Sequence, residues 1–247
     1  MSDPFLVIGA FLAAWPAAWC VHRMVVHIPP WIATPGPESD TPRVMEVELK
    51  SDDLAAALNN QGMPAAPVWS PSNPRHLSAW VCLFLGTLFA CSAMKWGASL
   101  STATSMLLIS ILTTLSWIDI RTGLLPDVLT KSGAAIALII HAWYGSLPFT
   151  SAVIGLSVGY LSLWVFFQLY RLATKKDGMG YGDFKLFAMI GAWLGWESLA
   201  PVLLVASLAA LVVAIMGVIM RRLSLQSSMP FGPYLAFGGI LSLFEWI

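Results

Sequence analysis

Long apolar stretches constrain this chain more than any other feature of its sequence. A helix that spans a bilayer needs about 17–25 predominantly apolar residues, and eight such stretches occur along the 247 residues. They lie near Phe5–His22, Leu77–Met94, Ala98–Ile118, Ser132–Gly145, Ser151–Tyr170, Phe184–Trp196, Pro201–Met220 and Phe231–Ile247. The fourth and sixth stretches are short and can extend into their neighbouring loops. The sequence therefore predicts an all-α fold, a polytopic membrane helix bundle with about eight transmembrane helices.

The scarcity of charge supports the same fold class and excludes several others. Charged residues make up 11% of the chain, whereas an ordinary soluble domain carries about 25%. The 13 Lys and Arg residues balance the 13 Asp and Glu residues, so the basic excess typical of a nucleic-acid binder is absent. Composition thus argues against a soluble globular enzyme, a disordered chain and a nucleic-acid partner, and it makes membrane lipid the expected surroundings.

The distribution of cations predicts the orientation of the bundle. If the N-terminus lies outside, alternate crossings put all but one of the 13 Lys and Arg residues on the cytoplasmic side, and the exception is Lys95. The positive-inside rule describes such asymmetry. The first stretch has no basic residue before it, so we expect a retained helix rather than a cleaved signal peptide. Four tryptophans fall at the expected outer ends, as in an aromatic belt: Trp96, Trp143, Trp196 and Trp246.

We expect one domain overall, in three parts. Residues 1–23 form the first transmembrane helix, residues 24–76 form a cytoplasmic loop, and residues 77–247 form the membrane bundle that carries the candidate site. The loop is rich in proline and has more acidic than basic residues, with one helix-like piece around Val44–Leu58. It is too small to bury a sizeable core of its own, so it should pack on the bundle or stay partly mobile.

Cysteine and histidine spacing predicts no metal site. The three cysteines lie inside apolar runs without a CxxC pair, which favours buried hydrophobic side chains over a zinc site or a disulfide; they are Cys20, Cys82 and Cys91. The four histidines show no ligand spacing and are expected in loops or at helix interfaces; they are His22, His27, His76 and His141.

Two aspartates carry the strongest chemical signal in the sequence. Asp119 ends one apolar run and Asp183 begins another, and the predicted topology puts both at the cytoplasmic face. A carboxylate at membrane depth is costly, so it marks a functional site by default. Two carboxylates close together share a proton. One can then activate a water while the other polarises a peptide carbonyl, which is aspartic proteolysis and needs neither a metal nor a covalent intermediate.

The protonation of the two aspartates can be assigned as a hypothesis from helix ends. Backbone amides at the start of the sixth helix favour an ionised Asp183. Asp119 lies at the carbonyl end of the third helix, so it should hold the shared proton more easily. A coupled pair titrates jointly, however, and the two sites share their apparent pKa values.

Residues near the aspartates form a candidate supporting loop. Gly178, Gly180 and Gly182 permit positive φ and close backbone approach before Asp183; the alternative is a flexible loop with Asp183 as a helix N-cap. Asp127 follows Pro126, so it is either an N-cap of the fourth helix or part of the site. Lys185 lies one turn into an apolar helix and must either pair with an acid or extend its amine toward water.

Three blocks of sequence resemble a known family. Residues 115–130, LSWIDIRTGLLPDVLT, resemble the first catalytic block of bacterial type IV prepilin peptidases. Residues 180–186, GYGDFKL, resemble the second block, the GxGD signature with its following lysine. Residues 230–236, PFGPYLA, resemble the C-terminal Phe-Gly-Pro element. The similarity covers roughly Leu77 to Ile247, and the three blocks occur in the family's order.

The resemblance implies a function and a site. Asp119 and Asp183 correspond to the catalytic pair of a multi-pass peptidase in the bacterial inner membrane, with its N-terminus in the periplasm. Such enzymes cut type IV prepilins or pseudopilins after a glycine, between a short basic leader and the hydrophobic helix of the mature subunit, in pilus assembly or type II secretion. Proteolysis needs no cofactor. Many members also methylate the new N-terminus with S-adenosylmethionine, and many carry CxxC pairs in the first loop, where residues 24–76 here have no cysteine.

A second hypothesis is an ion-coupled membrane transporter that uses the two aspartates as a proton relay, because intramembrane carboxylates also mark ion pathways. It leaves the glycine run before Asp183 unexplained. It also leaves unexplained why both acids lie at one face, since transport sites favour the midplane.

Overall fold

The computed structural model describes Gly9 and residues 74–145, 147–175, 180–220 and 229–245, with side chains described from Leu83 onward. Within these ranges the chain is helical and contains no strand. The elements are α4 (Pro74–Trp96), α5 (Leu100–Thr122), α6 (Asp127–Tyr144), α7 (Phe149–Thr174), α8 (Tyr181–Leu194), the short 3-10 helix η1 (Trp196–Ser198), α9 (Leu199–Ile219) and α10 (Gly232–Leu243).

The helices follow the apolar pattern of the sequence. Each predicted stretch from the second to the eighth coincides with one of the helices α4 to α10. The first stretch and residues 24–73 of the predicted loop lie outside the described residues, and α4 begins at Pro74, inside the range expected for the loop. In the described part, Leu100–Thr122, Phe149–Thr174 and Trp196–Ile219 are long and apolar enough to cross a membrane. The helical membrane class is confirmed, while the number of crossings stays a prediction.

Glycines end helices α5 and α6. Gly123 closes α5 with φ of 65° and donates its N–H to the carbonyl oxygen of Asp119. Gly145 closes α6 in the same way, with φ of 60° and a bond to the carbonyl of His141. Only glycine adopts this left-handed conformation without strain. The short connection of residues 123–126 then returns the chain into α6, so the end of α5 and the start of α6 lie at the same end of the bundle.

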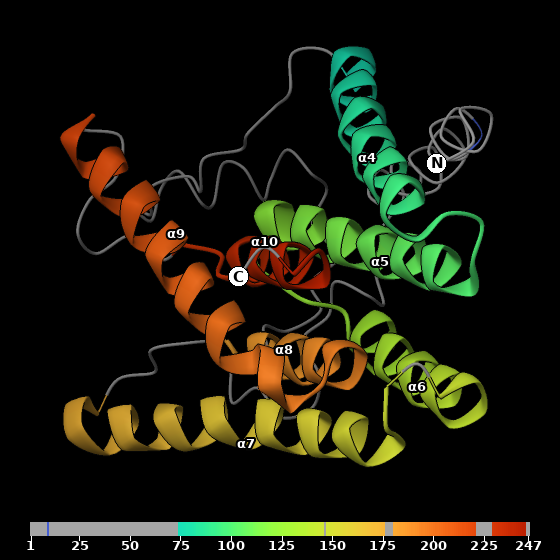
Figure 1. The fold of residues 1–247 in the computed structure, drawn as a ribbon. Helices are drawn as coiled ribbons and strands as arrows, with labels where there is room; N and C mark the ends of the chain where they lie inside the picture. The colour runs from blue at the N-terminus through green and yellow to red at the C-terminus, as the bar shows by residue number, and fades with distance from the viewer. Residues whose placement is uncertain (1–8, 10–73, 146, 176–179, 221–228, 246–247) are drawn as a thin grey trace, which may run out of the picture.

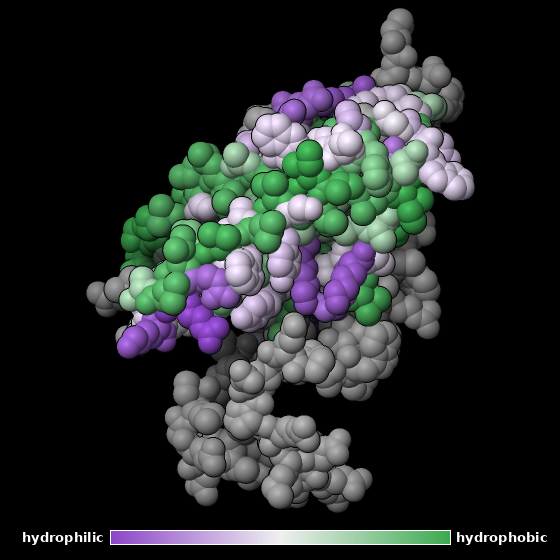
Figure 2. Space-filling view, turned by 90° about the horizontal axis from the view of Figure 1, so that it is seen from below, coloured by the Kyte–Doolittle hydropathy of each residue, from purple (hydrophilic) through white to green (hydrophobic). Residues whose placement is uncertain are grey.

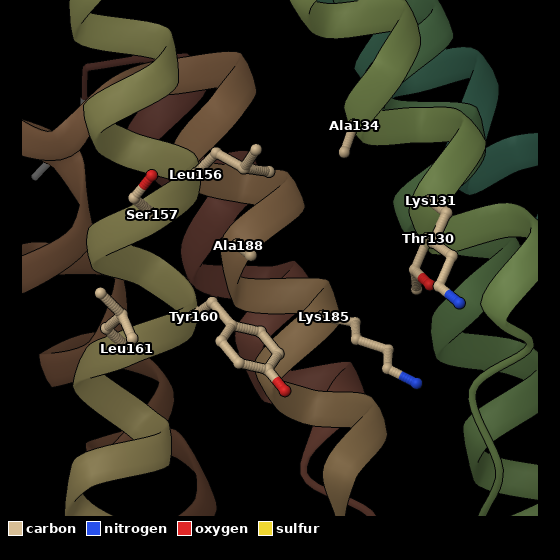
Figure 3. A pocket seen from close by; sticks show the side chains of 9 residues that line it. All are labelled: Thr130, Lys131, Ala134, Leu156, Ser157, Tyr160, Leu161, Lys185 and Ala188. Carbon is tan, nitrogen blue, oxygen red and sulfur yellow. The ribbon is translucent and has the colours of Figure 1, made fainter.

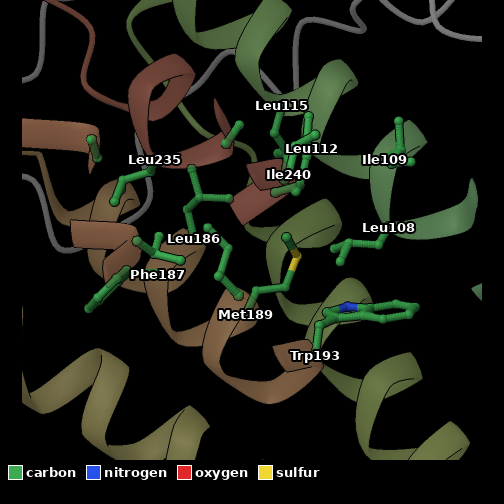
Figure 4. Packing of buried hydrophobic residues seen from close by; sticks show 14 of the residues in the cluster. Leu108, Ile109, Leu112, Leu115, Leu186, Phe187, Met189, Trp193, Leu235 and Ile240 are labelled. Carbon is green, nitrogen blue, oxygen red and sulfur yellow. The ribbon is translucent and has the colours of Figure 1, made fainter. Parts of the chain in front are cut away.

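Helix α8 lies at the centre of the described bundle. It contacts α7 on one side, and α5 and α10 lie on the other (Figure 1). Every residue from Phe184 to Trp193 except Lys185 is buried, as expected for a helix that is apolar on all sides. Figure 4 shows side chains from three helices meeting in this core: Leu108, Leu112, Leu115, Leu186, Met189, Leu235 and Ile240. The start of α8 is therefore held from several directions.

The crossing of α7 and α8 depends on small residues. A Cβ built on Gly155 would overlap the backbone carbonyl oxygen of Gly191, and one built on Gly191 would overlap that of Gly155. One turn further along α7, a Cβ on Gly159 would lie 2.9 Å from the Cα of Ala188. Close approach of backbones through small residues is a common way to pack helices in membranes, where no hydrophobic force drives helices together.

Polar side chains also join the helices. The indole Nε1 of Trp193 donates to the carbonyl of Gly133 at 3.0 Å, and the Nε2 of His141 lies 3.1 Å from the carbonyl oxygen of Trp193. His141 is therefore an interface histidine between α6 and α8, as predicted. Cys91 packs half-buried against the core. The side chains of the other three histidines and two cysteines lie outside the described residues.

The predicted outer ends of α4 and α10 meet. The Lys95 amine donates to the carbonyl of Phe244 at 2.9 Å and lies 3.3 Å from the Glu245 carboxylate. The rings of Trp96 and Phe244 stack with centroids 5.7 Å apart. Lys95, the one cation that the sequence predicts on the outer side, thus pairs with groups at the C-terminal end of α10.

The surface of α7 suits lipid. Figure 2 shows a broad hydrophobic face with hydrophilic side chains gathered along its edges. Large apolar side chains of α7 are exposed, including Ile154, Leu161, Phe166, Leu169 and Leu172. A patch of this extent would favour aggregation in water, whereas in a bilayer it contacts acyl chains.

The α7–α8 crossing gives a first prediction. Gly155→Ala should lower the unfolding free energy in detergent by about 1–3 kcal/mol, because the added methyl meets backbone that cannot rotate away. Thermal unfolding of purified protein measures the change. The matched control is Ser157→Ala on the exposed side of the same helix, which should unfold within a degree or two of wild type. Equal midpoints for the two variants would contradict this account of the crossing.

Candidate active site

Asp119 lies in the last turn of α5, with 4% of its surface exposed. The backbone N–H of Gly232, at the start of α10, donates to its Oδ2 at 2.9 Å. The end of one helix and the beginning of another thus meet at this carboxylate, although they are far apart in the sequence. A buried carboxylate needs such a donor, because burial without a hydrogen bond is costly.

Asp183 lies in the first turn of α8, with 7% of its surface exposed. Gly180 is the N-cap residue, and the Asp183 N–H donates to the Gly180 carbonyl at 3.2 Å. The alternative in which Asp183 itself caps the helix is therefore wrong. Its carboxylate and that of Asp119 interact electrostatically, so the fold brings the two predicted aspartates together.

Gly180 and Gly182 serve close approach rather than positive φ. Neither has a left-handed backbone, which corrects part of the expectation from the sequence. A Cβ on Gly182 would lie 2.8 Å from the Cβ of Leu125, so the absence of a side chain lets the α5–α6 connection approach α8. A Cβ on Gly180 would lie 3.7 Å from the Oδ2 of Asp183, which places Gly180 beside the carboxylate. Gly178 lies outside the described residues.

The electrostatics of the pair differ from the sequence-based hypothesis. Burial, followed by the negative charge of Asp119, raises the pKa of Asp183 to about 7. The N–H of Gly232 stabilises the ionised form of Asp119, because a hydrogen bond to a carboxylate favours its charge. The Gly232 donor thus favours a negative charge on Asp119, whereas the hypothesis from helix ends put the charge on Asp183; which aspartate holds the proton stays a prediction.

Asp127 and Lys185 form an ion pair with each other. Both are close in sequence to one of the two buried aspartates, Asp119 and Asp183, but Lys185 pairs with Asp127 instead. The Lys185 amine contacts both oxygens of Asp127, at 2.7 and 2.9 Å, and Lys131 contacts Oδ2 at 2.8 Å. Pro126 is the N-cap of α6 and Asp127 is its first residue, without a capping bond, so the N-cap prediction for Asp127 is wrong. Partial burial alone would raise the pKa of Asp127, but the two lysines outweigh it and hold the pKa below 3.8.

A groove of about 520 Å³ lies between α6, α7 and α8. Figure 3 shows Lys185 and Lys131 directed toward its polar end, with Leu156, Tyr160 and Leu161 along its apolar wall. Neither Asp119 nor Asp183 lines it. The ion pair and the groove thus belong to a different side of α8 from the carboxylate pair.

Gly232 lies next to Asp119, although the sequence did not predict it as a residue of the site. The signal was present, because a Phe-Gly-Pro element before an apolar run marks a helix start, and topology places that start at the cytoplasmic face. Sequence alone did not show that the free amide there would meet Asp119. Among the described side chains, no three His, Cys, Asp or Glu residues cluster as a metal site would require.

Fold and site together define a class: a helical membrane protein with a buried pair of aspartates between helix ends. Residues 106–215 match the family model described as the type IV leader peptidase family, and this segment contains both aspartates. No solved structure matches the chain significantly.

Curated relatives agree with this family. The chain is 39% identical over 155 residues to a protein of Pectobacterium carotovorum, covering 63% of this chain and 56% of the relative. It is 42% identical over 151 residues to one of Pseudomonas putida, covering 61% and 52%. It is 43% identical over 148 residues to one of Aeromonas salmonicida, covering 60% and 50%. Each is named prepilin leader peptidase/N-methyltransferase, and the chain spans about half the length of these relatives.

The Asp127–Lys185 pair gives a prediction about acid stability. Its lowered pKa means that Asp127 stabilises the fold above pH 3.8 and loses this contribution as pH falls through the lowered value. Asp127→Asn and Lys185→Met should therefore couple by about 0.2–1 kcal/mol near neutral pH, a range suited to a partly exposed pair. A double-mutant cycle of unfolding in detergent measures the coupling. It should fade below about pH 3, and a coupling that persists there would contradict the ion pair as its source.

Proposed function

We propose that this chain is a membrane aspartic endopeptidase that removes the short basic leader from type IV prepilins or pseudopilins. The observation that carries the proposal is the buried Asp119–Asp183 pair, in which burial, followed by the charge of Asp119, raises the pKa of Asp183. Two interacting carboxylates that hold one proton are suited to peptide hydrolysis by a bound water. The family of residues 106–215 and the names of the relatives support the substrate class.

Hydrolysis by the pair proceeds in two balanced steps. The ionised carboxylate takes a proton from water as the water oxygen bonds to the carbonyl carbon. The protonated carboxyl gives its proton to the carbonyl oxygen, and a gem-diol forms. In the second step the C–N bond breaks, one diol proton returns to the carboxylate that had donated, and the amine leaves with the proton taken from water. The products are a carboxyl group on the leader and a free amine on the mature chain.

Location and selectivity follow from the distribution of charge. The cytoplasmic side of the bacterial inner membrane is the proposed location, since the positive-inside rule puts the ends of α5 and the start of α8 there. A basic leader would approach from this side, where the excess of acidic residues in the segment 24–73 would attract it in a salt-dependent manner. Asp127, Lys185, Gly180 and Gly182 are proposed to support the pair by fixing the start of α8.

Methylation of the new N-terminus stays outside this proposal. The relatives are named N-methyltransferases as well as peptidases, and such an activity would use S-adenosylmethionine. The groove between α6, α7 and α8 has a mainly apolar lining, and its two lysines, Lys131 and Lys185, are paired with Asp127, so it presents no acidic group to a sulfonium cation. We therefore derive no methyl-transfer step. The alternative of an ion-coupled transporter has no support from the relatives, and proton uptake into liposomes without cleavage would favour it.

Loss of either aspartate should abolish cleavage. Asp119→Asn and Asp183→Asn should each reduce kcat by about 10²–10⁴-fold or more, because each removes one partner of the proton transfer. Incubation of purified protein with a prepilin, followed by mass spectrometry of the product N-terminus, measures cleavage and any methyl group together. Glu197→Gln is the matched control at an exposed position near the opposite end of α8. Processing by both aspartate variants at the wild-type rate would refute the proposed pair.

The pH dependence of cleavage provides a separate test. The pair must hold one proton to act, and with the pKa of Asp183 raised to about 7 that proton is present below this pH and lost above it. The value of kcat/KM should therefore fall about tenfold per pH unit on the alkaline side. A rate that stays constant up to about pH 9 would contradict proton donation by this group.

A further inference from the structure

The first turn of α10 contains a backbone donor with an unusual partner. The first N–H groups of any helix have no acceptor within the helix and must find one elsewhere. In α10, the Tyr234 N–H donates to the Phe231 carbonyl at 3.1 Å, and Pro233 has no N–H. The N–H of Gly232 is the remaining donor of this turn, and it points to the Oδ2 of Asp119 at 2.9 Å. The helix start is thus matched to a carboxylate on another helix.

The approach of the two groups also depends on the missing side chain. A Cβ on Gly232 would lie 2.6 Å from Asp119 Oδ2, 3.1 Å from its Cγ and 3.3 Å from its Cβ. The carboxylate itself, which is buried, fills the space that any other residue would need. Gly232 is buried as well, so a larger residue could not turn toward solvent without moving α10.

We infer that Gly232 is a positioning residue of the proteolytic site: its N–H orients the Asp119 carboxylate and keeps it ionised as the base, which leaves the shared proton on Asp183. The inference rests on the proposed function. It extends the site beyond the aspartate pair to the Phe-Gly-Pro turn, and it assigns each aspartate one role. The positive end of the α10 dipole acts in the same direction as the hydrogen bond.

The geometry explains why the roles do not follow from the two helices that carry the aspartates. Asp119 lies at the C-terminal end of α5, where the helix dipole disfavours a negative charge. The amide of Gly232 comes from a third helix and opposes that effect at hydrogen-bond distance. A direct hydrogen bond to a charged carboxylate is a strong interaction, so the Gly232 N–H outweighs the unfavourable effect of the α5 dipole on Asp119.

Two changes at Gly232 test the space and the donor separately. Gly232→Ala adds a methyl against the carboxylate and should lower kcat by about 10²-fold with little change in KM, since a displacement of about 1 Å at a catalytic group has an effect of this size. Replacement of Gly232 by glycolic acid during cell-free synthesis removes the N–H and adds no side chain. It should lower kcat as well. The Gly232 N–H has no acceptor within α10, so its loss breaks no helix bond; the Phe231 carbonyl becomes an ester carbonyl and accepts more weakly from the N–H groups of Tyr234 and Leu235, an effect that thermal unfolding reports.

The matched control is Gly239→Ala on the same helix, where a Cβ would lie 3.4 Å from flexible methyl groups of Ile190 and Leu112. This variant should retain wild-type kcat. Thermal unfolding in detergent is measured for all proteins, and the glycolic acid variant decides the outcome if Gly232→Ala unfolds. If wild type cleaves and the Gly232 and Gly239 variants have equal kcat, the role inferred for Gly232 is wrong, while the proposed function stands. Absence of cleavage by wild type would overturn the proposed function instead.

Discussion

The placement of α8 is the constraint on which the rest of the structure depends. A helix with buried residues on all sides can stay in a membrane bundle only if its neighbours approach closely, and here Gly155 and Gly191 allow two backbones to touch. This contact holds α8 against α7, while α6 and α10 also pack against it. Because Asp183 is in the first turn of that helix, its position is determined by packing along the whole length of α8 rather than by a local loop.

Burial then determines the chemistry of the carboxylates. Two acids in contact with water would both ionise and would serve no purpose as a proton-sharing pair. With 4% and 7% of their surfaces exposed, Asp119 and Asp183 are shielded from water, and burial followed by the charge of Asp119 raises the pKa of Asp183 to about 7. The ion pair of Asp127 with Lys185 is more exposed and has two cations for one acid, so it is suited to fastening helices rather than to moving protons.

Much of this fold and site could be predicted from the sequence, and the failures have a common cause. Apolar runs predicted each described helix, and the cost of charge in a membrane singled out Asp119 and Asp183. The failure concerns contacts between elements: Asp127 was expected as a cap of its own helix, but Pro126 is the cap and Asp127 pairs with Lys185 of α8. The donor that Asp119 receives from α10 was likewise not visible from α5 alone. Local rules describe one helix at a time, whereas Lys185 and Gly232 approach these acids from other helices.

The bond between Gly232 and Asp119 also bears on how much chain makes a working unit. The segment that matches the family model ends at residue 215, before α10 begins. A fragment bounded by that match would contain both acids and the whole of α8, yet it would leave Asp119 facing a void in place of an amide. The site as inferred therefore needs the third block, residues 230–236, as well as the two blocks that carry the aspartates.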